Sequence, residues 1–328
     1  MKSFRHINVS TIEEAVRILK EYQGSARVTA GGTDILGVLK DKMLPDYPQA
    51  LINIKTVSGL DNIREDGQGI KIGSLVKLAD LVNSPVVKEK YKVLTEAART
   101  VAAPQIRNMG TVGGNLAQDT RCWYYRYPHS IGERILCLRK GSGPCFAVKG
   151  DNRYHAIFGG KRCFAVCPSD IATALVALNA EIKTIGVGGS RTIPVRDFYN
   201  PLGNVLEPEE LILEVNVPKP PEKANQQFLK YTLRKPVDFA VVSAAVLAVV
   251  DKGICSEARI ALGAVAPGPI RADAAEQLIK GRRLDTIMLE EAAEEAVNGA
   301  KPLSRNGYKV DIAKTLVKKG LSGFKYIQ

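Results

Sequence analysis

The chain has 328 residues, of which 45% are hydrophobic and 24% charged, a composition typical of a globular protein with two or three domains. The formal net charge is +12, but basic residues alternate with acidic ones and no Arg and aromatic platform for bases is present, so no nucleic-acid partner is expected. No apolar run is long enough to span a bilayer and the N-terminus has no apolar signal core, so we expect no membrane association and a cytoplasmic location.

The first predicted elements are a helix and a strand that ends in two glycines. Ser10 and Glu13 have the spacing of a capping box, with Ser10 as the N-cap of the helix. A β-branched strand over 26–29 leads into Ala30-Gly31-Gly32-Thr33-Asp34, and the apolar periodicity of a helix begins at Ile35. Backbone N–H groups that converge at such a turn can hold a phosphate, whereas a plain left-handed turn is the simpler alternative for one such motif taken alone.

A second pair of glycines comes later in the chain, after several predicted strands and helices. Strands are expected over 50–55 and 69–73, and helices over 77–82 and 94–101, with Pro104 as the stop of the last helix. The chain then reaches Thr111-Val112-Gly113-Gly114-Asn115, which has the features of a second glycine loop. Neither pair fits the dinucleotide or Walker pattern. Two such loops in one domain would suit the two ends of a pyrophosphate.

Five of the six cysteines lie in one stretch, between the second glycine motif and Asp170. A cytosolic protein uses cysteine for metal or redox chemistry more often than for disulfides. Four thiolates are the usual complement of a [4Fe-4S] cluster. The spacing is long and irregular, so zinc and free thiols remain alternatives on spacing alone.

The last third of the chain predicts a hairpin, a linker and a separate domain. The hairpin joins strands over 181–184 and 191–195, and another strand covers 210–217. Pro218 to Glu222 has the composition of a stiff linker. Beyond it we expect antiparallel strands over 228–233, 239–250 and 258–264, covered by helices over 272–278, 289–297 and 311–317.

Taken together, the motifs resemble the FAD-binding medium subunit of the molybdenum hydroxylases, the family of xanthine dehydrogenase, aldehyde oxidoreductase, carbon monoxide dehydrogenase and 4-hydroxybenzoyl-CoA reductase. The resemblance is carried by the two glycine motifs and Pro168-Ser169-Asp170, in that order, and covers the whole chain. It implies an α+β fold with a vanillyl-alcohol-oxidase-like (PCMH-type) FAD-binding domain and a C-terminal α+β domain like that of CO dehydrogenase flavoproteins. The implied bounds are 1–218, with subdomains of about 1–55 and 56–218, and 223–328.

The same resemblance implies which residues hold the cofactor. Segments 29–36 and 111–115 would wrap the FAD diphosphate and ribityl chain, and Val101 would lie near the adenine. Asp170 would bind a hydroxyl or amide of FAD. Ile212 and Lys230 would lie near the isoalloxazine ring, where a cation favours the anionic reduced flavin; the alternative is a solvated lysine on a strand edge. The full expected set is Thr29, Ala30, Gly31, Gly32, Thr33, Asp34, Ile35, Leu36, Val101, Thr111, Val112, Gly113, Gly114, Asn115, Asp170, Ile212 and Lys230.

The cysteine stretch resembles an insert that carries an additional [4Fe-4S] cluster in 4-hydroxybenzoyl-CoA reductase and several aldehyde oxidoreductases. The insert is expected at about 119–165, and the implied ligands are Cys122, Cys137, Cys145 and Cys163. Cys167 stands where the family has His before Pro-Ser-Asp, and is the alternative to Cys163 as fourth ligand. Cys255 is expected to be a lone buried thiol. His129 and His155 are candidate hydrogen-bond donors to the ligands of the cluster, but a surface position is favoured for both.

The implied function is electron transfer within a larger enzyme, since no acid–base pair or nucleophile is apparent and no catalytic residue is expected. FAD and the cluster would pass electrons between [2Fe-2S] centres on a small subunit and an external electron carrier. A large subunit would hold the molybdenum cofactor, completing a heterotrimer whose further dimerisation is left open. The alternatives are a free-standing flavin-dependent reductase of the same fold and a non-catalytic assembly module.

Overall fold

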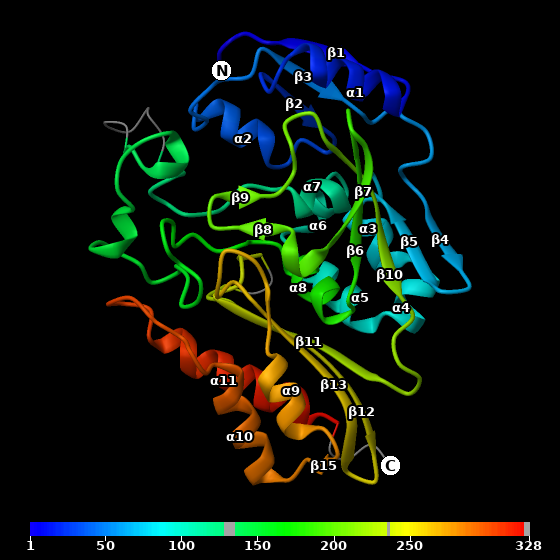
Figure 1. The fold of residues 1–328 in the computed structure, drawn as a ribbon, viewed down its shortest axis with the longest axis vertical. Coiled ribbons are helices and arrows are strands. Elements are labelled where there is room, and N and C mark those ends of the chain that lie inside the picture. Colours follow the sequence, from blue (N-terminus) through cyan, green and yellow to red (C-terminus); the bar gives the residue numbers. More distant parts are fainter. Residues whose placement is uncertain (128–134, 235–236, 325–328) are drawn as a thin grey trace.

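The computed structural model describes residues 1–127, 135–234 and 237–324. Three sheets follow one another along the long axis of the molecule, with the N-terminal sheet at one end and the C-terminal sheet at the other (Figure 1). Helices pack against each sheet, so the predicted α+β class is confirmed.

The N-terminal sheet is parallel, in the order β1 (Arg5–Asn8), β3 (Ala50–Asn53), β2 (Ala26–Thr29), and carries helices α1 (Ile12–Glu21) and α2 (Ile35–Lys40). The cap of α1 lies one residue later than predicted. Thr11, not Ser10, is the N-cap, and its hydroxyl accepts the N–H of Glu14 at 3.1 Å. The Glu14 carboxylate reaches back to the Ser10 N–H at 2.8 Å, which completes the box.

The middle sheet is antiparallel and is followed in space by a layer of helices. Its order is β4 (Ile63–Asp66), β5 (Gly69–Gly73), β10 (Leu211–Pro218), β6 (Glu181–Gly186), β7 (Gly189–Pro194). The helices are α3 (Leu78–Asn83), α4 (Pro85–Lys90), α5 (Lys92–Arg99), α6 (Pro104–Arg107), α7 (Val112–Leu116) and α8 (Asp170–Ala177). Pro104 was expected to stop a helix, but α5 ends at Arg99 and Pro104 begins α6, a position that needs no backbone N–H donor.

The C-terminal sheet has the order β11 (Asn225–Tyr231), β12 (Val242–Asp251), β13 (Ile254–Gly263), β14 (Ile270–Arg271), and β15 (Arg282–Arg283) also pairs with β13. Helices α5 and α8 contact this sheet, as do α9 (Asp273–Ile279) and α11 (Tyr308–Ser322), and α10 (Thr286–Ala296) packs against α9 and α11. Every residue of α8 is buried, because the helix is enclosed within the core that joins the middle and C-terminal sheets.

The cysteine-bearing insert leaves the fold after α7 and returns at α8. Its described residues form loops with two short 3-10 turns, η1 (Leu138–Lys140) and η2 (Phe146–Val148), and appear as the green lobe at one side of Figure 1. A further 3-10 turn, η3 (Val195–Asp197), and the small hairpin β8 (Tyr199–Asn200) and β9 (Gly203–Asn204) lie in the connection between β7 and β10 of the middle sheet. The insert is tied to the C-terminal domain by Asn152, whose side chain bonds Ser304 and the Arg305 N–H.

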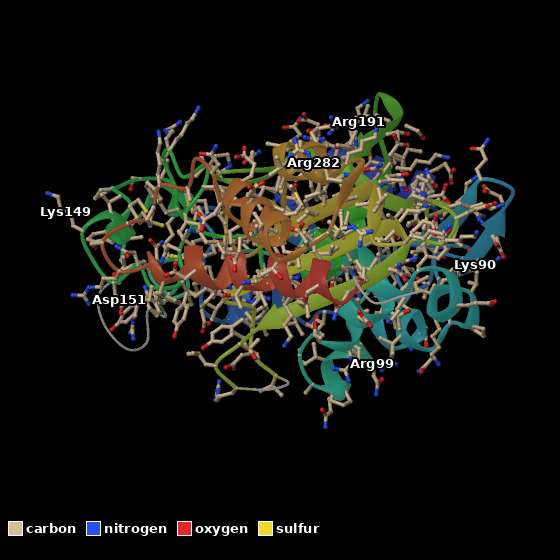
Figure 2. All side chains as sticks on the ribbon, turned by 90° about the horizontal axis from the view of Figure 1, so that it is seen from below. Lys90, Arg99, Lys149, Asp151, Arg191 and Arg282 are labelled. Carbon is tan, nitrogen blue, oxygen red and sulfur yellow. The ribbon has the colours of Figure 1, made fainter. Side chains whose placement is uncertain are left out.

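Charged side chains are distributed around the molecule. In the view of Figure 2, the labelled basic residues lie on different sides of the molecule: Lys149 at the left, Lys90 at the right, Arg99 at the bottom, and Arg191 and Arg282 near the top. They come from helices, strands and the insert, so the net positive charge is not concentrated on one element. Among the described residues no helix has the length and hydropathy needed to cross a membrane.

Candidate functional site

The first glycine motif leaves its backbone N–H groups available. Within the described parts of the chain, no protein group accepts a hydrogen bond from the N–H groups of residues 31–35. Gly32 has φ +72°, the left-handed region that glycine adopts without strain. Gly31 is required by close packing, because a Cβ there would lie 1.9 Å from the carbonyl oxygen of Met109. The turn therefore lies against the segment that precedes the second motif.

The second glycine motif is a short helix, so the prediction of a second loop with free amides is wrong. Thr111 is the N-cap of α7, and its hydroxyl accepts the Gly114 N–H at 3.1 Å. Carbonyl groups of Val76 and Ser74 accept the N–H groups of Val112 and Gly113 at 2.8 and 2.9 Å, and Thr111 accepts that of Asn115. A Cβ on Gly113 would meet Ser74 at 2.8 Å, so this glycine serves packing.

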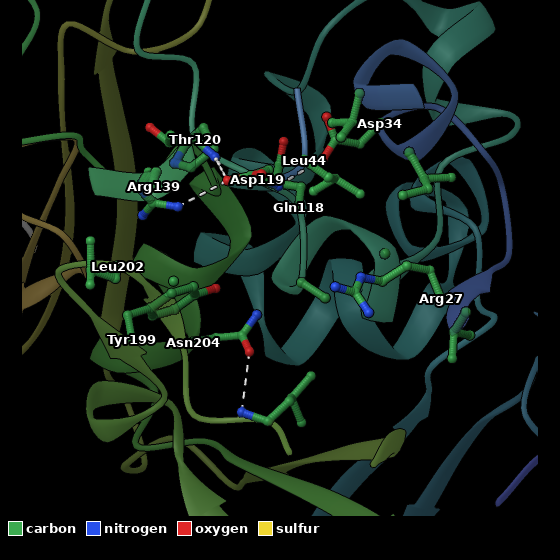
Figure 3. A pocket seen from close by; sticks show the side chains of 18 of the residues that line it. Arg27, Asp34, Leu44, Gln118, Asp119, Thr120, Arg139, Tyr199, Leu202 and Asn204 are labelled. Carbon is green, nitrogen blue, oxygen red and sulfur yellow. Dashed lines mark hydrogen bonds and ion pairs between the residues drawn. The ribbon is translucent and has the colours of Figure 1, made fainter. Parts of the chain in front are cut away.

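A cavity of about 570 Å³ joins the two motifs. Figure 3 shows side chains of Arg27, Asp34, Asp119, Arg139 and Tyr199 arranged around it. Of the predicted cofactor residues, those that line this cavity are Ala30, Gly31, Gly32, Thr33, Asp34, Ile35, Thr111 and Gly114. Free N–H groups on a cavity wall are the feature that binds an anion such as a diphosphate.

Asp34 connects the first glycine motif to the start of the insert. Its carboxylate pairs with Arg121 at 2.7 Å and Arg126 at 2.8 Å, and also accepts the Asp119 N–H at 2.7 Å. All three partners come from one short segment that includes Cys122, and the Arg126 N–H bonds the Cys122 carbonyl. The side chain of Asp34 is therefore occupied by the protein, and its predicted contact with cofactor is left to its backbone N–H.

A second cavity, of about 470 Å³, lies between the insert, the start of α8 and the C-terminal sheet. Its wall includes Trp123, Tyr154 and Phe239, which give it aromatic surfaces, and Asp170 from the predicted set. Two buried polar atoms on this wall, Ser243 Oγ and His155 Nδ1, have no hydrogen-bond partner within the described residues. Aromatic walls with a few unsatisfied polar atoms are typical of a site for a planar polar ring.

Asp170 and Lys230 form a buried ion pair. The Lys230 Nζ lies 2.7 Å from the Asp170 carboxylate and donates to the Thr100 carbonyl at 2.9 Å, and both side chains are about 95% buried. The alternative of a solvated lysine is thus wrong. Burial raises the pKa of Asp170, and the Lys230 ammonium opposes this shift. The pair brings the N-terminus of α8, strand β11 and the end of α5 together beside the second cavity.

The remaining predicted FAD residues lie away from both cavity walls. Val101, Val112 and Ile212 are buried in the core shared by the middle and C-terminal domains. Asn115 is buried and accepts a hydrogen bond from the Ser169 hydroxyl at 2.6 Å, which links α7 to the cap of α8. The others are Thr29, buried at the end of β2, Leu36, exposed on α2, and Gly113, packed against Ser74.

The four cysteines predicted as cluster ligands line one small cavity. Cys122, Cys137, Cys145 and Cys163 share its wall, together with Arg139 and Tyr125. Burial raises the pKa of Cys122 to about 11, and Cys163 and Cys145 are close enough to add to the shift. Cys167 instead packs in the core near Tyr199 and lines the two larger cavities. Cys255 is buried in the C-terminal core, apart from this group.

No compact single-ion site is present in the parts of the chain that the structure describes: no three His, Cys, Asp or Glu side chains are grouped closely enough to hold one metal ion. The four cysteines therefore share a cavity without closing on a point at its centre. A tetrahedral zinc site would place its sulfur atoms about 3.8 Å apart, because each lies about 2.3 Å from the metal.

The burial of His155 is a feature that the sequence did not predict. It was expected on the surface with His129, which lies outside the described residues. Its side chain is buried and lines the second cavity, with Nε2 3.2 Å from the Cys122 sulfur and Nδ1 without a hydrogen-bond partner among the described residues. Burial lowers the pKa of His155 to about 4, with a smaller contribution from Lys309, so the ring is neutral near pH 7. No periodicity in the sequence marks this histidine as buried.

The three cavities have walls in common. Val166, Cys167 and Pro168 line both large cavities. Cys122 and Ala165 line the second cavity and the cysteine cavity. Two segments, 119–125 and 163–170, therefore supply the shared walls of the cavity at the first glycine turn, the aromatic cavity and the cysteine cavity.

Two known protein families together match almost the whole chain. Residues 2–220 match the family described as the FAD binding domain in molybdopterin dehydrogenase, and residues 227–323 match the CO dehydrogenase flavoprotein C-terminal domain. The two matches meet at the linker between β10 and β11.

Similar proteins and structures cover almost the full length. The aldehyde oxidoreductase FAD-binding subunit PaoB of Escherichia coli strain K12 is 36% identical over 326 residues, which is 96% of each chain. A carbon monoxide dehydrogenase chain from Hydrogenophaga pseudoflava superimposes with a TM-score of 0.78 at 27% identity, covering 98% of this chain and 96% of that one. A quinoline 2-oxidoreductase chain from Pseudomonas putida 86 gives 0.77 at 25% identity, with 99% and 100% coverage.

Proposed function

This chain belongs to the FAD-binding medium subunits of the molybdenum hydroxylase family, and on that premise we propose that it carries electrons through FAD and a [4Fe-4S] cluster held in the insert. It is an oxidoreductase subunit, and its proposed partners are a large subunit with the molybdenum cofactor and a small subunit with [2Fe-2S] centres. The electrons would pass between those centres and an external carrier.

Binding of the FAD diphosphate is supported by the first glycine motif. Its N–H groups over 31–35 face a cavity of about 570 Å³ and have no acceptor among the described protein groups. Consecutive backbone N–H groups at a glycine turn on a cavity wall bind anions such as a diphosphate, so this turn is suited to that part of FAD. Bound FAD supplies a carrier that accepts and releases electrons one or two at a time. The protein contributes the positions of the N–H groups and the exclusion of water by the walls.

The aromatic cavity is proposed to hold the flavin ring. Trp123, Tyr154 and Phe239 would enclose a planar ring, and Ser243 Oγ and His155 Nδ1 would bond its polar edge. The Asp170–Lys230 pair lies behind this wall and orients the start of α8. Because Lys230 is paired, its charge would act on the ring only weakly. Val101 and Ile212, proposed at the start for direct contact, would act through packing of the wall.

The cluster is supported by the shared cavity of Cys122, Cys137, Cys145 and Cys163. Four thiolates are the ligand set of a [4Fe-4S] cluster, and each binds a different iron, so the sulfur atoms need not approach one another as they do around a single zinc ion. Trp123, Tyr124 and Tyr125 lie in or next to this region and would limit access of water. We also propose domain bounds of 1–218 and 223–328, with the insert at about 119–165, which fit the sheets and the linker.

One observation carries the proposal: a turn with free N–H groups, an aromatic cavity and a cavity lined by four cysteines share walls within one small region. Electron carriers exchange electrons efficiently only at short range, so adjacent binding sites are what an electron-transfer subunit requires.

The decisive experiment is anaerobic purification of the full chain, followed by its visible spectrum and by FAD, iron, sulfide and zinc analysis. FAD with four irons and four sulfides per chain supports the proposal. Cys145→Ser should lose iron, whereas Cys255→Ser, a buried thiol outside the group, should keep it. Flavin without iron would favour the free-standing flavin-dependent reductase. Zinc without iron would contradict the proposed [4Fe-4S] cluster. A colourless protein would contradict both proposed cofactors and would favour the non-catalytic assembly module.

A further inference from the structure

The imidazole of His155 lies between one cysteine of the proposed cluster site and the aromatic cavity. Its Nε2 is 3.2 Å from Cys122 Sγ, while its Nδ1 is buried with no partner among the described residues, and the residue lines the aromatic cavity. The rings of Trp123 and Tyr124 flank it, each with its centroid 6.0 Å away. The other three cysteines have no such ring nitrogen within hydrogen-bond distance in the described structure.

Hydrogen bonds to the backbone N–H and carbonyl of His155 hold this residue in position. The His155 N–H donates to the Asn152 carbonyl at 3.0 Å, and the His155 carbonyl accepts from Asn306 Nδ2 and from Lys309 Nζ, both at 3.0 Å. Lys309 also donates to the Ala264 carbonyl at 2.6 Å, which anchors the group to the end of β13. Asn306 and Lys309 are fully buried and come from the C-terminal domain. Three hydrogen bonds therefore fix the backbone of a residue that sequence alone would leave on the surface.

We propose that His155 donates a hydrogen bond from Nε2 to the Cys122 sulfur of the bound cluster, and thereby raises the reduction potential of that cluster. The inference rests on the proposed function, because it needs the four cysteines to hold iron. In the tautomer with its proton on Nε2, Nε2 donates and Nδ1 is left as an acceptor. His155 is thus a positioning residue that also connects the wall of one cofactor site to a ligand of the other.

The direction of the effect follows from charge. Reduction adds one negative charge, and part of it resides on the thiolate sulfurs. A hydrogen bond to a sulfur stabilises the more negative state, so it favours reduction. A buried site strengthens this effect because little water is present to compensate for a lost donor. Loss of the His155 donor is therefore expected to lower the reduction potential.

The test compares two variants of the full chain, purified anaerobically, by redox titration of the cluster signal in electron paramagnetic resonance. His155→Phe removes both ring nitrogens and keeps an aromatic ring of similar size. His155→Gln places an amide N–H donor near the former Nε2. His6→Phe, at an exposed position on β1, is the matched control.

We expect His155→Phe to reduce the equilibrium constant for one-electron reduction about tenfold, which corresponds to about 59 mV. His155→Gln should return the potential toward the wild-type value, and His6→Phe should leave it unchanged. An equal potential in wild type and His155→Phe would overturn the inference, and so would an equal loss in both His155 variants.

A measurement on the wild type decides the matter if His155→Phe fails to retain a cluster. Protein labelled with ¹⁵N-histidine should show an exchangeable proton and a ¹⁵N coupling to the reduced cluster in electron–nuclear double resonance. Absence of both couplings would overturn the inference while leaving the proposed function intact. A wild type without iron would overturn the proposed function as well, so the two failures are distinguishable by iron analysis alone.

Discussion

Substitution of Gly31 by alanine tests whether the two glycine motifs must lie in contact. A Cβ at this position would be 1.9 Å from the Met109 carbonyl oxygen and 2.7 Å from its carbon, far inside the 3.0 Å that Cβ atoms respect. The obstacle is backbone, so the two segments would have to separate by about 1 Å. Free protein can relieve the strain by opening the motifs, but bound FAD would hold them together. Gly31→Ala is therefore expected to lower the affinity for FAD more than it lowers the stability of the free protein.

The expected magnitude follows from the cost of overpacking, which is about 1–3 kcal/mol. Since 1.4 kcal/mol is a factor of ten in affinity, Gly31→Ala should weaken FAD binding about 5- to 150-fold. Gly37→Ala is the matched control, because Gly37 lies inside α2 and nothing is within 4 Å of its added Cβ. Alanine there should stabilise the helix by up to about 1 kcal/mol and leave FAD binding unchanged.

The assay is a titration of deflavinated full chain with FAD, followed by quenching of flavin fluorescence, with thermal unfolding of each variant in parallel. The reasoning would be refuted by a Gly31→Ala protein with the FAD affinity and unfolding temperature of the wild type. A loss of affinity in Gly37→Ala equal to that in Gly31→Ala would also refute it, because the effect would then not depend on contact with Met109.

Three further changes probe the site. Iron analysis should show that Cys163→Ser loses the cluster and Cys167→Ser keeps it, because Cys163 lines the cysteine cavity and Cys167 does not; the reverse result would exchange their roles. Lys230→Met should destabilise the fold by about 3–5 kcal/mol by leaving the Asp170 charge unpaired, and adding Asp170→Asn should recover part of this in denaturant unfolding. Burial lowers the pKa of Lys309 from 10.5 to about 7. The unfolded chain therefore binds more protons between these values, and wild-type stability relative to Lys309→Met should rise with pH from 7 to 10.5; a constant difference would contradict this.

Much of the fold could be predicted because local patterns agree with the tertiary structure. The β-branched residues of β2, the glycine-bounded β5 and the hairpin of β6 and β7 all lie where the sequence indicates. Strands β1 and β4 escaped prediction because they have mainly exposed side chains and show no clear apolar alternation. The two-residue strands β8, β9, β14 and β15 escaped because they are too short to show a pattern. Helix α7 escaped for another reason. Its glycines disfavour a helix, but the Thr111 cap and carbonyls from the segment before α3 stabilise it.

The site was predicted less completely, because its pairings join distant parts of the chain. Lys230 and Asp170 are 60 residues apart, and only the folded sheet and helix bring them together. Asp34 was expected in the segment that wraps FAD, and nothing in the sequence indicated that Arg121 and Arg126 occupy its side chain from 87 and 92 residues away. His155 shows the limit of sequence-based prediction most clearly. Its burial depends on Asn306 and Lys309, which follow it by about 150 residues.

The pairings of Asp34 give the insert a direct connection to the FAD-binding turn. Arg121 precedes Cys122, and both arginines that hold Asp34 lie within the segment that begins the cysteine cavity. A change in position of the 31–35 turn on binding FAD would therefore act on Cys122 through two ion pairs and one N–H bond. The opposite end of the insert, 163–170, leads into α8 and supplies walls to all three cavities. Each proposed cofactor would thus stabilise the walls of the other, because both bind surfaces built from the same two segments.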